Sequence, residues 1–175
     1  MPGESKVQGK HRRIRLGMVG GGPAAFIGAV HRIAARMDDC YELVAAALSS
    51  DPGKSLAAAE ELHIPRAYGR FEEMAVAEAG RPDGIEVVAI VTPNHMHYAN
   101  AKKFLEAGIH VICDKPLTTT IEDALDLAKI VERTGLIFGL THNYTGYPIM
   151  QQAQEIMLTK ELGALRVVQM EYAQD

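Results

Sequence analysis

The stretch Ile14-Arg15-Leu16-Gly17-Met18-Val19-Gly20-Gly21-Gly22-Pro23 decides the fold of this chain. Its apolar first half predicts a strand over residues 14–19, which runs directly into glycines that open a predicted helix over residues 23–37. Glycines at such a turn allow the tight bend, let a pyrophosphate approach the backbone, and let the helix pack closely on the strand. The N–H groups at the start of the helix then face the phosphate charge. The order strand, glycines, helix therefore predicts a dinucleotide site.

Four residues of this turn, Gly20, Gly22, Pro23 and Ala24, are the predicted cofactor contacts. The pattern G-x-G-x-x-G fits residues 20–25, with Ala25 in the third position, where alanine is permitted. A glycine-rich hairpin without a ligand is the alternative, and the helix pattern that follows disfavours it.

Strand and helix patterns then alternate along the chain, which is typical of a parallel sheet built from βαβ units. We expect further strands at 42–48, 84–91, 109–113 and 136–141, and helices at 54–63, 71–79, 94–107 and 120–133. Residues 84–91 are apolar nearly throughout, as in a strand covered on both faces. The predicted fold class is α/β, with a doubly wound parallel sheet of the Rossmann type and the start of a second α/β domain.

The domain boundaries are predicted from the residues at which the alternation of strand and helix patterns begins and ends. Residues 1–12 are polar and are predicted to be a disordered tail, and residues 13–145 form the dinucleotide-binding domain. Residues 146–175 are predicted to begin a truncated second domain, with a helix at 148–161 and a strand at 164–173. No helix follows that strand, and a lone sheet edge is poorly stabilised.

Composition excludes several classes of protein. A net charge of −4 over 175 residues disfavours nucleic-acid binding, which needs a basic face. The basic cluster at 10–13 is interpreted as part of a solvated tail, or as a charged anchor before the first strand. No run reaches the roughly 18 apolar residues of a membrane span, and no secretory signal is recognisable. Two distant cysteines fit a reducing compartment, so a cytoplasmic protein is expected.

The end of the second predicted strand should contact the adenosine ribose, about 20 residues further along the chain in this fold. Ser49, Ser50 and Asp51 lie there. An acid directly at the strand end would bind the ribose 2′-hydroxyl and repel the phosphate of NADP, whereas serine is more permissive. Asp51 also suits the cap of the next helix. Both NAD and NADP stay open as the cofactor, with NAD slightly favoured.

Two more polar stretches follow predicted strands, at the edge where open α/β sheets bind ligands. Thr92, Pro93, Asn94 and His97 follow one strand, and Asp114 and Lys115 follow the next. His95 and His97 lack a third metal ligand nearby, so no metal site is expected. Lys115 is interpreted either as a surface lysine or as a cation that hydrogen-bonds a substrate hydroxyl while hydride leaves.

Three motifs together resemble the Gfo/Idh/MocA oxidoreductase family, named for glucose–fructose oxidoreductase and inositol dehydrogenase. They are the glycine turn continued by Gly28-x-x-His31, the stretch Thr92-Pro93-Asn94-His95-x-His97, and Asp114-Lys115-Pro116. The resemblance covers residues 13–172. It implies an N-terminal Rossmann domain that binds NAD(P), and a C-terminal domain that binds sugar-like substrates and forms a homo-oligomer.

The resemblance also implies residue roles. The family's usual tripeptide is Glu-Lys-Pro, so Lys115 corresponds to its lysine, and the following peptide bond to proline is expected to be cis. Asp114 replaces the usual Glu and can still reach a ribose hydroxyl. Asn143 follows the last strand, where family members approach the nicotinamide.

The expected function is therefore an NAD(P)-dependent dehydrogenase that transfers hydride at a sugar, polyol or cyclitol hydroxyl, with Lys115 as the catalytic residue. The family's further catalytic Asp and His lie well downstream and have no counterpart before residue 175, so this chain is expected to be mainly the cofactor-binding half. A non-catalytic dinucleotide-binding sensor is the alternative. A methyltransferase also uses a glycine-rich first turn, but the Asp-Lys-Pro stretch would have no function in such a protein, which disfavours this class.

Overall fold

A computed structural model describes residues 12–173 of the chain. These residues contain one sheet of six strands in the order β3-β2-β1-β4-β5-β6, and each strand is parallel to its neighbours. The strands are β1 Ile14–Gly20, β2 Tyr41–Ala47, β3 Arg66–Ala67, β4 Val87–Val91, β5 His110–Asp114 and β6 Phe138–Thr141. This is the strand order of the Rossmann fold, with its topological switch point between β1 and β4.

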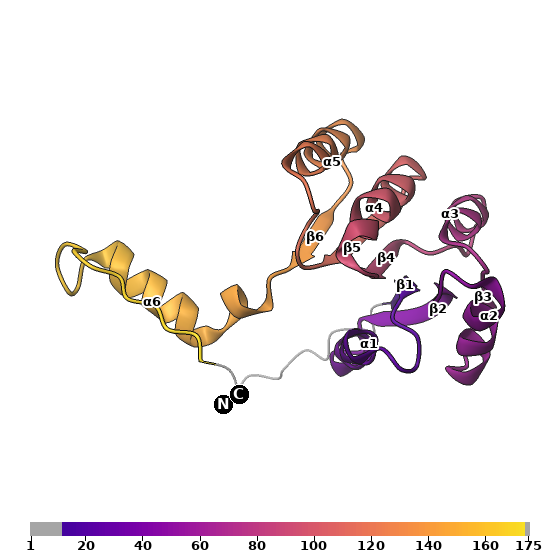
Figure 1. Ribbon diagram of the computed structural model, residues 1–175, viewed down its shortest axis with the longest axis horizontal. Coiled ribbons are helices and arrows are strands. Elements are labelled where there is room, and N and C mark those ends of the chain that lie inside the picture. The colour runs from indigo at the N-terminus through magenta and orange to yellow at the C-terminus, as the bar shows by residue number, and fades with distance from the viewer. Residues whose placement is uncertain (1–11, 174–175) are drawn as a thin grey trace, which may run out of the picture. The chain divides into compact units, whose positions relative to one another are not determined.

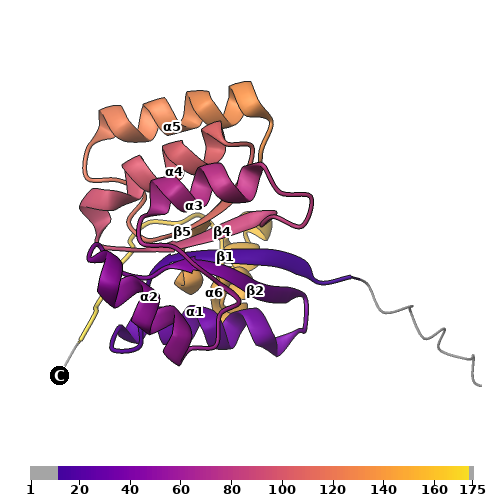
Figure 2. The same cartoon turned by 90° about the vertical axis from the view of Figure 1, so that its right-hand side faces the viewer.

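Helices cover both faces of this sheet (Figure 2). The helices are α1 Phe26–Met37, α2 Pro52–Glu61, α3 Phe71–Ala79, α4 His97–Glu106 and α5 Ile121–Thr134, with a short 3-10 helix η1 over Asn94–Met96. α1 and α2 lie on one face, and α3, α4 and α5 lie on the other (Figures 1 and 2). The doubly wound α/β fold that the alternating pattern predicts is confirmed.

The core has two parts because the side chains of each strand alternate between the faces. In β4, Val88 and Ile90 belong to the cluster under α3–α5. Val87, Ala89 and Val91 belong to the cluster under α1 and α2. All five β4 residues are buried, which explains why this strand is uniformly apolar in sequence.

The predicted boundaries differ from the observed ones at a few points. β3 has only two residues, too few to give a sequence pattern, and was not predicted. α1 begins at Phe26, not Pro23, because the Ala25 N–H donates to the Gly22 carbonyl and closes a turn there. Residues 1–11 of the predicted disordered tail lie outside the described residues.

Arg12 was also assigned to that tail, and the structure corrects this. Its guanidinium donates two hydrogen bonds to the carboxylate of Glu86, at 2.7 and 2.8 Å. Together with the Arg15 backbone N–H, this interaction lowers the pKa of Glu86 to about 2. The described end of the basic cluster therefore anchors the chain before β1.

The chain divides into two compact units between Thr141 and His142, four residues before the predicted domain boundary at 145. The second unit contains a 3-10 helix η2 over Asn143–Gly146 and the helix α6 over Pro148–Thr159, which confirms the helix predicted there. The predicted strand at 164–173 is wrong for the described residues, which have no strand assignment. A strand exists only beside a hydrogen-bonded neighbour, and the described part of this unit offers none.

A buried carboxylate ties α3 to the sheet edge. The Glu78 side chain is fully buried and accepts hydrogen bonds from Arg66 at 2.7 and 2.8 Å, the Tyr68 hydroxyl at 2.6 Å and the Ile85 N–H at 3.0 Å. Desolvation raises the pKa of Glu78, but the hydrogen bonds from Arg66 and Tyr68 outweigh it, so the pKa lies below its ordinary value. Burial, together with the hydrogen bond to Glu78 and the Glu78 charge, raises the pKa of Tyr68 to about 12.

Replacing Glu78 with Gln is expected to destabilise the fold by about 2 kcal/mol, because charge-assisted bonds are lost and the partly buried Arg66 keeps only its longer ion pair with Asp83, at 3.8 Å. Urea unfolding measures this, with the exposed Glu72→Gln as the matched control on α3. Since the folded pKa of Glu78 is below the unfolded value, its contribution is present at neutral pH and is lost as pH falls through the folded pKa. Equal unfolding midpoints for the two variants would contradict this role.

Within the described residues, none of the helices combines the length and the apolar run that a bilayer crossing requires.

Candidate functional site

The predicted contacts from four strands meet at one edge of the sheet. β1, β2, β4 and β5 are parallel neighbours, so their carboxyl ends lie together, and the β1/β4 switch point falls in the middle. The close contacts of Gly20 show that the loop after β1 and the loop after β4 lie against each other. Gly20 has a φ of +76°, and a Cβ at this position would lie 2.8 Å from Thr92 Cγ2 and 2.9 Å from the Val91 carbonyl oxygen. Only glycine fits between these loops.

A second close approach joins the glycine turn to α1. A Cβ on Gly28 would lie 2.5 Å from Gly21 Cα and closer still to the Gly21 carbonyl oxygen. Gly28 is thus the glycine that lets the helix pack against the turn. This corrects the reading of Ala25 as the third position of the motif, because Ala25 is the N-cap residue of α1 and precedes the helix.

Arg32 lies four residues after Gly28 in α1 and binds the backbone of the glycine turn. The sequence analysis did not predict this role. Arg32 is buried, and its guanidinium donates to the Gly21 carbonyl oxygen. Burial lowers the pKa of Arg32, and the nearby Arg36 charge lowers it further. The available signal was the four-residue spacing, since Gly28 and Arg32 are the two buried residues of α1.

The start of α1 is open for an anion. Its N-cap residue, Ala25, makes no side-chain capping bond, so the first N–H groups of the helix are left without that partner. Gly22 leaves space at the turn, because a Cβ there would meet nothing closer than the Leu48 carbonyl oxygen at 3.5 Å. Pro23 and Ala24 form the exposed part of the turn. These features fit a bound pyrophosphate.

The loop after β2 carries the three residues predicted to face the adenosine ribose. Asp51 caps α2 by accepting from the Lys54 N–H at 2.9 Å, as predicted. Ser49 Oγ accepts from the Asp51 N–H at 3.1 Å, and Ser50 is exposed. The two hydroxyls, and not the carboxylate, are therefore the groups free of a capping role at this strand end.

Two side chains of α4, His97 and Asn100, contact the loop after β4. Thr92 Oγ1 accepts from the Asn100 side-chain amide at 3.2 Å, while Pro93 and Asn94 are exposed at the edge. His97 is 1% exposed, and its ring nitrogens lie 2.7 Å from the Pro116 carbonyl oxygen and 2.9 Å from the Thr92 carbonyl oxygen. Both nitrogens thus face protein atoms, and neither faces the edge where a cofactor would lie.

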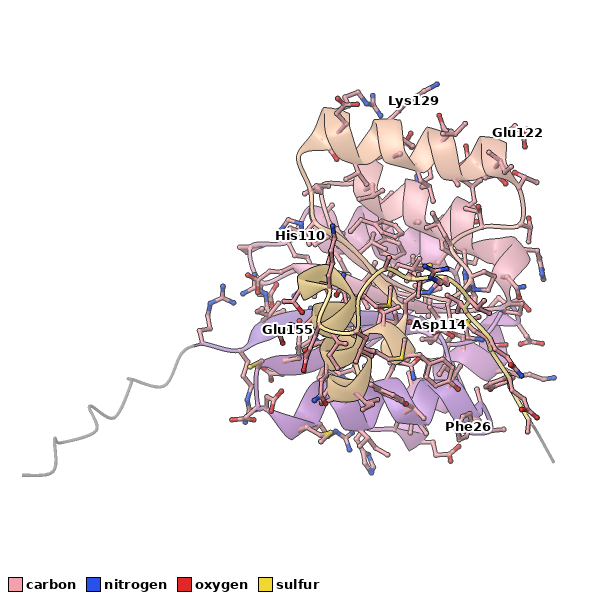
Figure 3. All side chains as sticks on the ribbon, turned by 90° about the vertical axis from the view of Figure 1, so that its left-hand side faces the viewer. Phe26, His110, Asp114, Glu122, Lys129 and Glu155 are labelled. Atoms are coloured by element: carbon pink, nitrogen blue, oxygen red, sulfur yellow. The ribbon has the colours of Figure 1, made fainter. Side chains whose placement is uncertain are left out.

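Asp114 ends β5 next to a small polar cluster. Its Oδ1 accepts from the Thr141 hydroxyl at 2.8 Å and lies 3.8 Å from His31 Nε2, which is too long for a hydrogen bond. Burial lowers the pKa of His31, and the Asp114 charge opposes this only in part. Among the described residues Oδ2 accepts no hydrogen bond, so it remains available for a ribose hydroxyl. Figure 3 shows Asp114 at this end of the sheet.

Lys115 follows Asp114 directly and is exposed. Its ammonium forms no ion pair with any residue that the structure describes. The Lys115–Pro116 peptide is cis, as the family resemblance implies. Asn143 lies in η2 of the second unit, so its predicted approach to the nicotinamide stays a prediction.

Two other features lie outside this edge. The residues that the structure describes hold no group of three or more His, Cys, Asp or Glu placed to bind a metal. A hollow of about 410 Å³, lined in part by Arg13, Tyr41 and His63, lies at the amino ends of β1 and β2. Ligands of open α/β sheets bind at the opposite, carboxyl edge, so this hollow is not the dinucleotide site.

The strand order, the glycine turn at the switch point and the open helix start together define a Rossmann domain with the features of a dinucleotide site. The chain belongs to the Gfo/Idh/MocA family, whose model, described as an oxidoreductase family with an NAD-binding Rossmann fold, matches residues 14–142. The resemblance inferred from the three motifs is thereby confirmed.

Two solved structures and one relative found by sequence agree with this assignment. An oxidoreductase from Sinorhizobium meliloti is 61% identical with a TM-score of 0.84, over 89% of this chain and 44% of that one. An inositol dehydrogenase homolog from Azotobacter vinelandii, complexed with NADH and myo-inositol, is 38% identical with a TM-score of 0.83, over 89% and 41%. A D-xylose 1-dehydrogenase (NADP(+)) from Haloferax volcanii is 31% identical over 69% of this chain and 35% of its own length. The chain thus spans less than half the length of these relatives.

Proposed function

We propose that the protein is an NAD(P)-dependent dehydrogenase that acts on a hydroxyl group of a sugar, polyol or cyclitol. The observation that carries this proposal is Lys115, an exposed cation at the ligand edge that pairs with no acidic side chain among residues 12–173 and directly follows Asp114 of β5. The relatives named for D-xylose and inositol support the substrate class. A pure binding domain has no need for a free ammonium group at this position.

The residues present fit a dinucleotide. Gly20 and Gly22 would admit the pyrophosphate to the uncapped start of α1, supported by Pro23 and Ala24. Ser49, Ser50 and Asp51 would face the adenosine ribose. Thr92, Pro93 and Asn94 would line the middle of the edge, and the free Oδ2 of Asp114 would accept from the second ribose.

The chemistry follows from these positions. A bound nicotinamide supplies the acceptor or donor of hydride at its C4 atom. In the oxidation direction the substrate C–H bond breaks and the hydroxyl becomes a carbonyl group. The Lys115 ammonium would hydrogen-bond the hydroxyl oxygen and stabilise the developing alkoxide, while the hydroxyl proton passes to solvent water. In the reverse reaction the same ammonium would polarise the carbonyl oxygen, and the proton returns from solvent.

The test is turnover by the full-length gene product. We expect reduction of NAD⁺, followed by absorbance, with at least one member of a panel of cyclitols, aldoses and anhydrosugars. Calorimetry with NADH on the 175-residue chain tests the cofactor site separately. A chain that binds no NADH would overturn the site. NADH binding without turnover of any hydroxyl substrate would favour the sensor alternative.

Within this function we propose NAD as the preferred cofactor, because the residues at this strand end, Ser49, Ser50 and Asp51, include no cation to receive a 2′-phosphate. Ser49→Asp is expected to weaken NADPH binding by about tenfold or more, since like charges at close range cost roughly 1–4 kcal/mol. NADH affinity should change by less than about threefold. Calorimetry with both nucleotides measures this, and tighter NADPH binding by the unaltered chain would contradict the preference.

We also propose that the full-length protein is a cytoplasmic homo-oligomer. Cys40 and Cys113 are both free thiols, which fits a reducing compartment. Burial raises the pKa of Cys113 to about 12, so that thiol is unreactive. Light scattering of the full-length protein tests the assembly.

A further inference from the structure

The loop that carries Lys115 depends on one buried side chain. Pro116 has no N–H to donate, and its carbonyl oxygen is bonded to His97 Nδ1 at 2.7 Å. Within the described residues no other hydrogen bond joins this loop to the loop after β4. Lys115 itself makes no ion pair with the residues that the structure describes. On one side of Lys115 the backbone belongs to β5, whose last residue, Asp114, pairs with Thr141; on the other side it is held through His97 and the Pro116 carbonyl.

His97 is suited to this task because its own place is fixed. It is the first residue of α4 and is 1% exposed, and Nε2 contacts the Thr92 carbonyl oxygen at 2.9 Å. Thr92 is held a second time, through its hydroxyl, by Asn100 of the same helix. The start of α4 thus connects the glycine-turn side of the edge, through Thr92, to the Lys115 side, through Pro116.

We infer that His97 is a positioning residue for Lys115, not a direct ligand of the cofactor. The inference rests on the proposed function of Lys115 and revises the sequence-based expectation that His97 touches the dinucleotide. Both partners of the ring are carbonyl oxygens, so a neutral ring donates to one of them; with the proton on Nδ1, His97 donates to the Pro116 carbonyl and sets the position of the adjacent lysine backbone. A displacement of about 1 Å at a reacting group costs roughly 10²-fold in rate, so losing this bond lowers kcat.

Two substitutions separate this role from simple packing. The amide nitrogen of Asn lies near the place of ring Nδ1, and that of Gln lies near the place of ring Nε2. His97→Asn therefore keeps a donor for Pro116, and His97→Gln keeps a donor for Thr92. Both variants remove the same buried ring, so packing loss alone would affect them alike.

In the full-length protein we expect His97→Gln to lower kcat by about 30-fold, with KM and the Kd for NADH within about threefold. His97→Asn should stay within about fivefold of the unaltered kcat. Equal loss of kcat in the two variants, in step with their melting temperatures, would overturn the positioning role. A large rise of the NADH Kd in both would restore His97 as a cofactor ligand.

A second measurement does not depend on turnover. Backbone ¹⁵N relaxation on the 175-residue chain should show the Lys115 and Leu117 amides becoming flexible in His97→Gln, with order parameters falling from about 0.85 to below about 0.6. The same amides should stay rigid in His97→Asn. If the unaltered protein oxidises no sugar, the proposed function fails, and relaxation still decides the role of His97. Rigid amides in both variants would refute it.

Discussion

Replacing Lys115 with Met lowers kcat of the full-length protein by about 10²–10⁴-fold, the range expected when a group that assists proton transfer is removed. The methionine keeps an unbranched side chain of similar length and removes only the charge and the donors. NADH affinity should change by less than about threefold, because the glycine turn and the start of α1 hold the phosphates. Steady-state kinetics and fluorescence titration with NADH measure the two effects.

Lys129→Met is the matched control. Lys129 is an exposed lysine of α5, on the helical layer and away from the ligand edge (Figure 3), and its replacement should leave kcat unchanged. Lys115→Arg keeps the charge but not the compact ammonium, so it should recover only part of the rate. Full turnover in Lys115→Met would remove Lys115 from the reaction and leave the ligand edge without its proposed acid–base group.

The fold was largely predictable because its signals are local. The run at residues 84–91 is apolar at nearly every position, and its strand, Val87–Val91, is apolar throughout, as expected for a strand covered on both faces. The failures have local reasons too. β3 has two residues and its pairing with β2 depends on a distant part of the chain. Residues 164–173 alternate like a strand, but alternation cannot create the neighbour that a strand needs.

The candidate site was predictable as a set of loops, not as a set of contacts. The rule that ligands bind at the carboxyl edge placed Thr92 and Lys115 together from strand order alone. The bonds of Arg32 to the Gly21 carbonyl and of His97 to Pro116 join residues 11 and 19 positions apart. Such contacts leave no periodicity in the sequence, so these two side chains were assigned either no role or a different one.

Gly28→Ala is expected to destabilise the fold by about 3 kcal/mol and to weaken NADH binding by more than about 100-fold. The added Cβ would lie 2.5 Å from Gly21 Cα, and backbone cannot yield as a flexible side chain does. Overpacking of this kind typically costs about 1–3 kcal/mol or more. The better helix propensity of alanine, about 1 kcal/mol, offsets only part of that cost. The helix must move away from the turn, and its N–H groups then miss the phosphates.

Gly22→Ala provides the decisive comparison, because the same methyl group is added six residues earlier. Its Cβ would meet only the Leu48 carbonyl oxygen, at 3.5 Å, an ordinary contact. Stability in urea should therefore change by less than about 0.5 kcal/mol, while NADH binding weakens by about tenfold or more, since the methyl group occupies the path of the pyrophosphate. If Gly22→Ala binds NADH normally, the phosphates lie elsewhere. If Gly28→Ala is as stable as the unaltered chain, α1 does not depend on this close approach, and the glycine turn does not position the helix for its ligand.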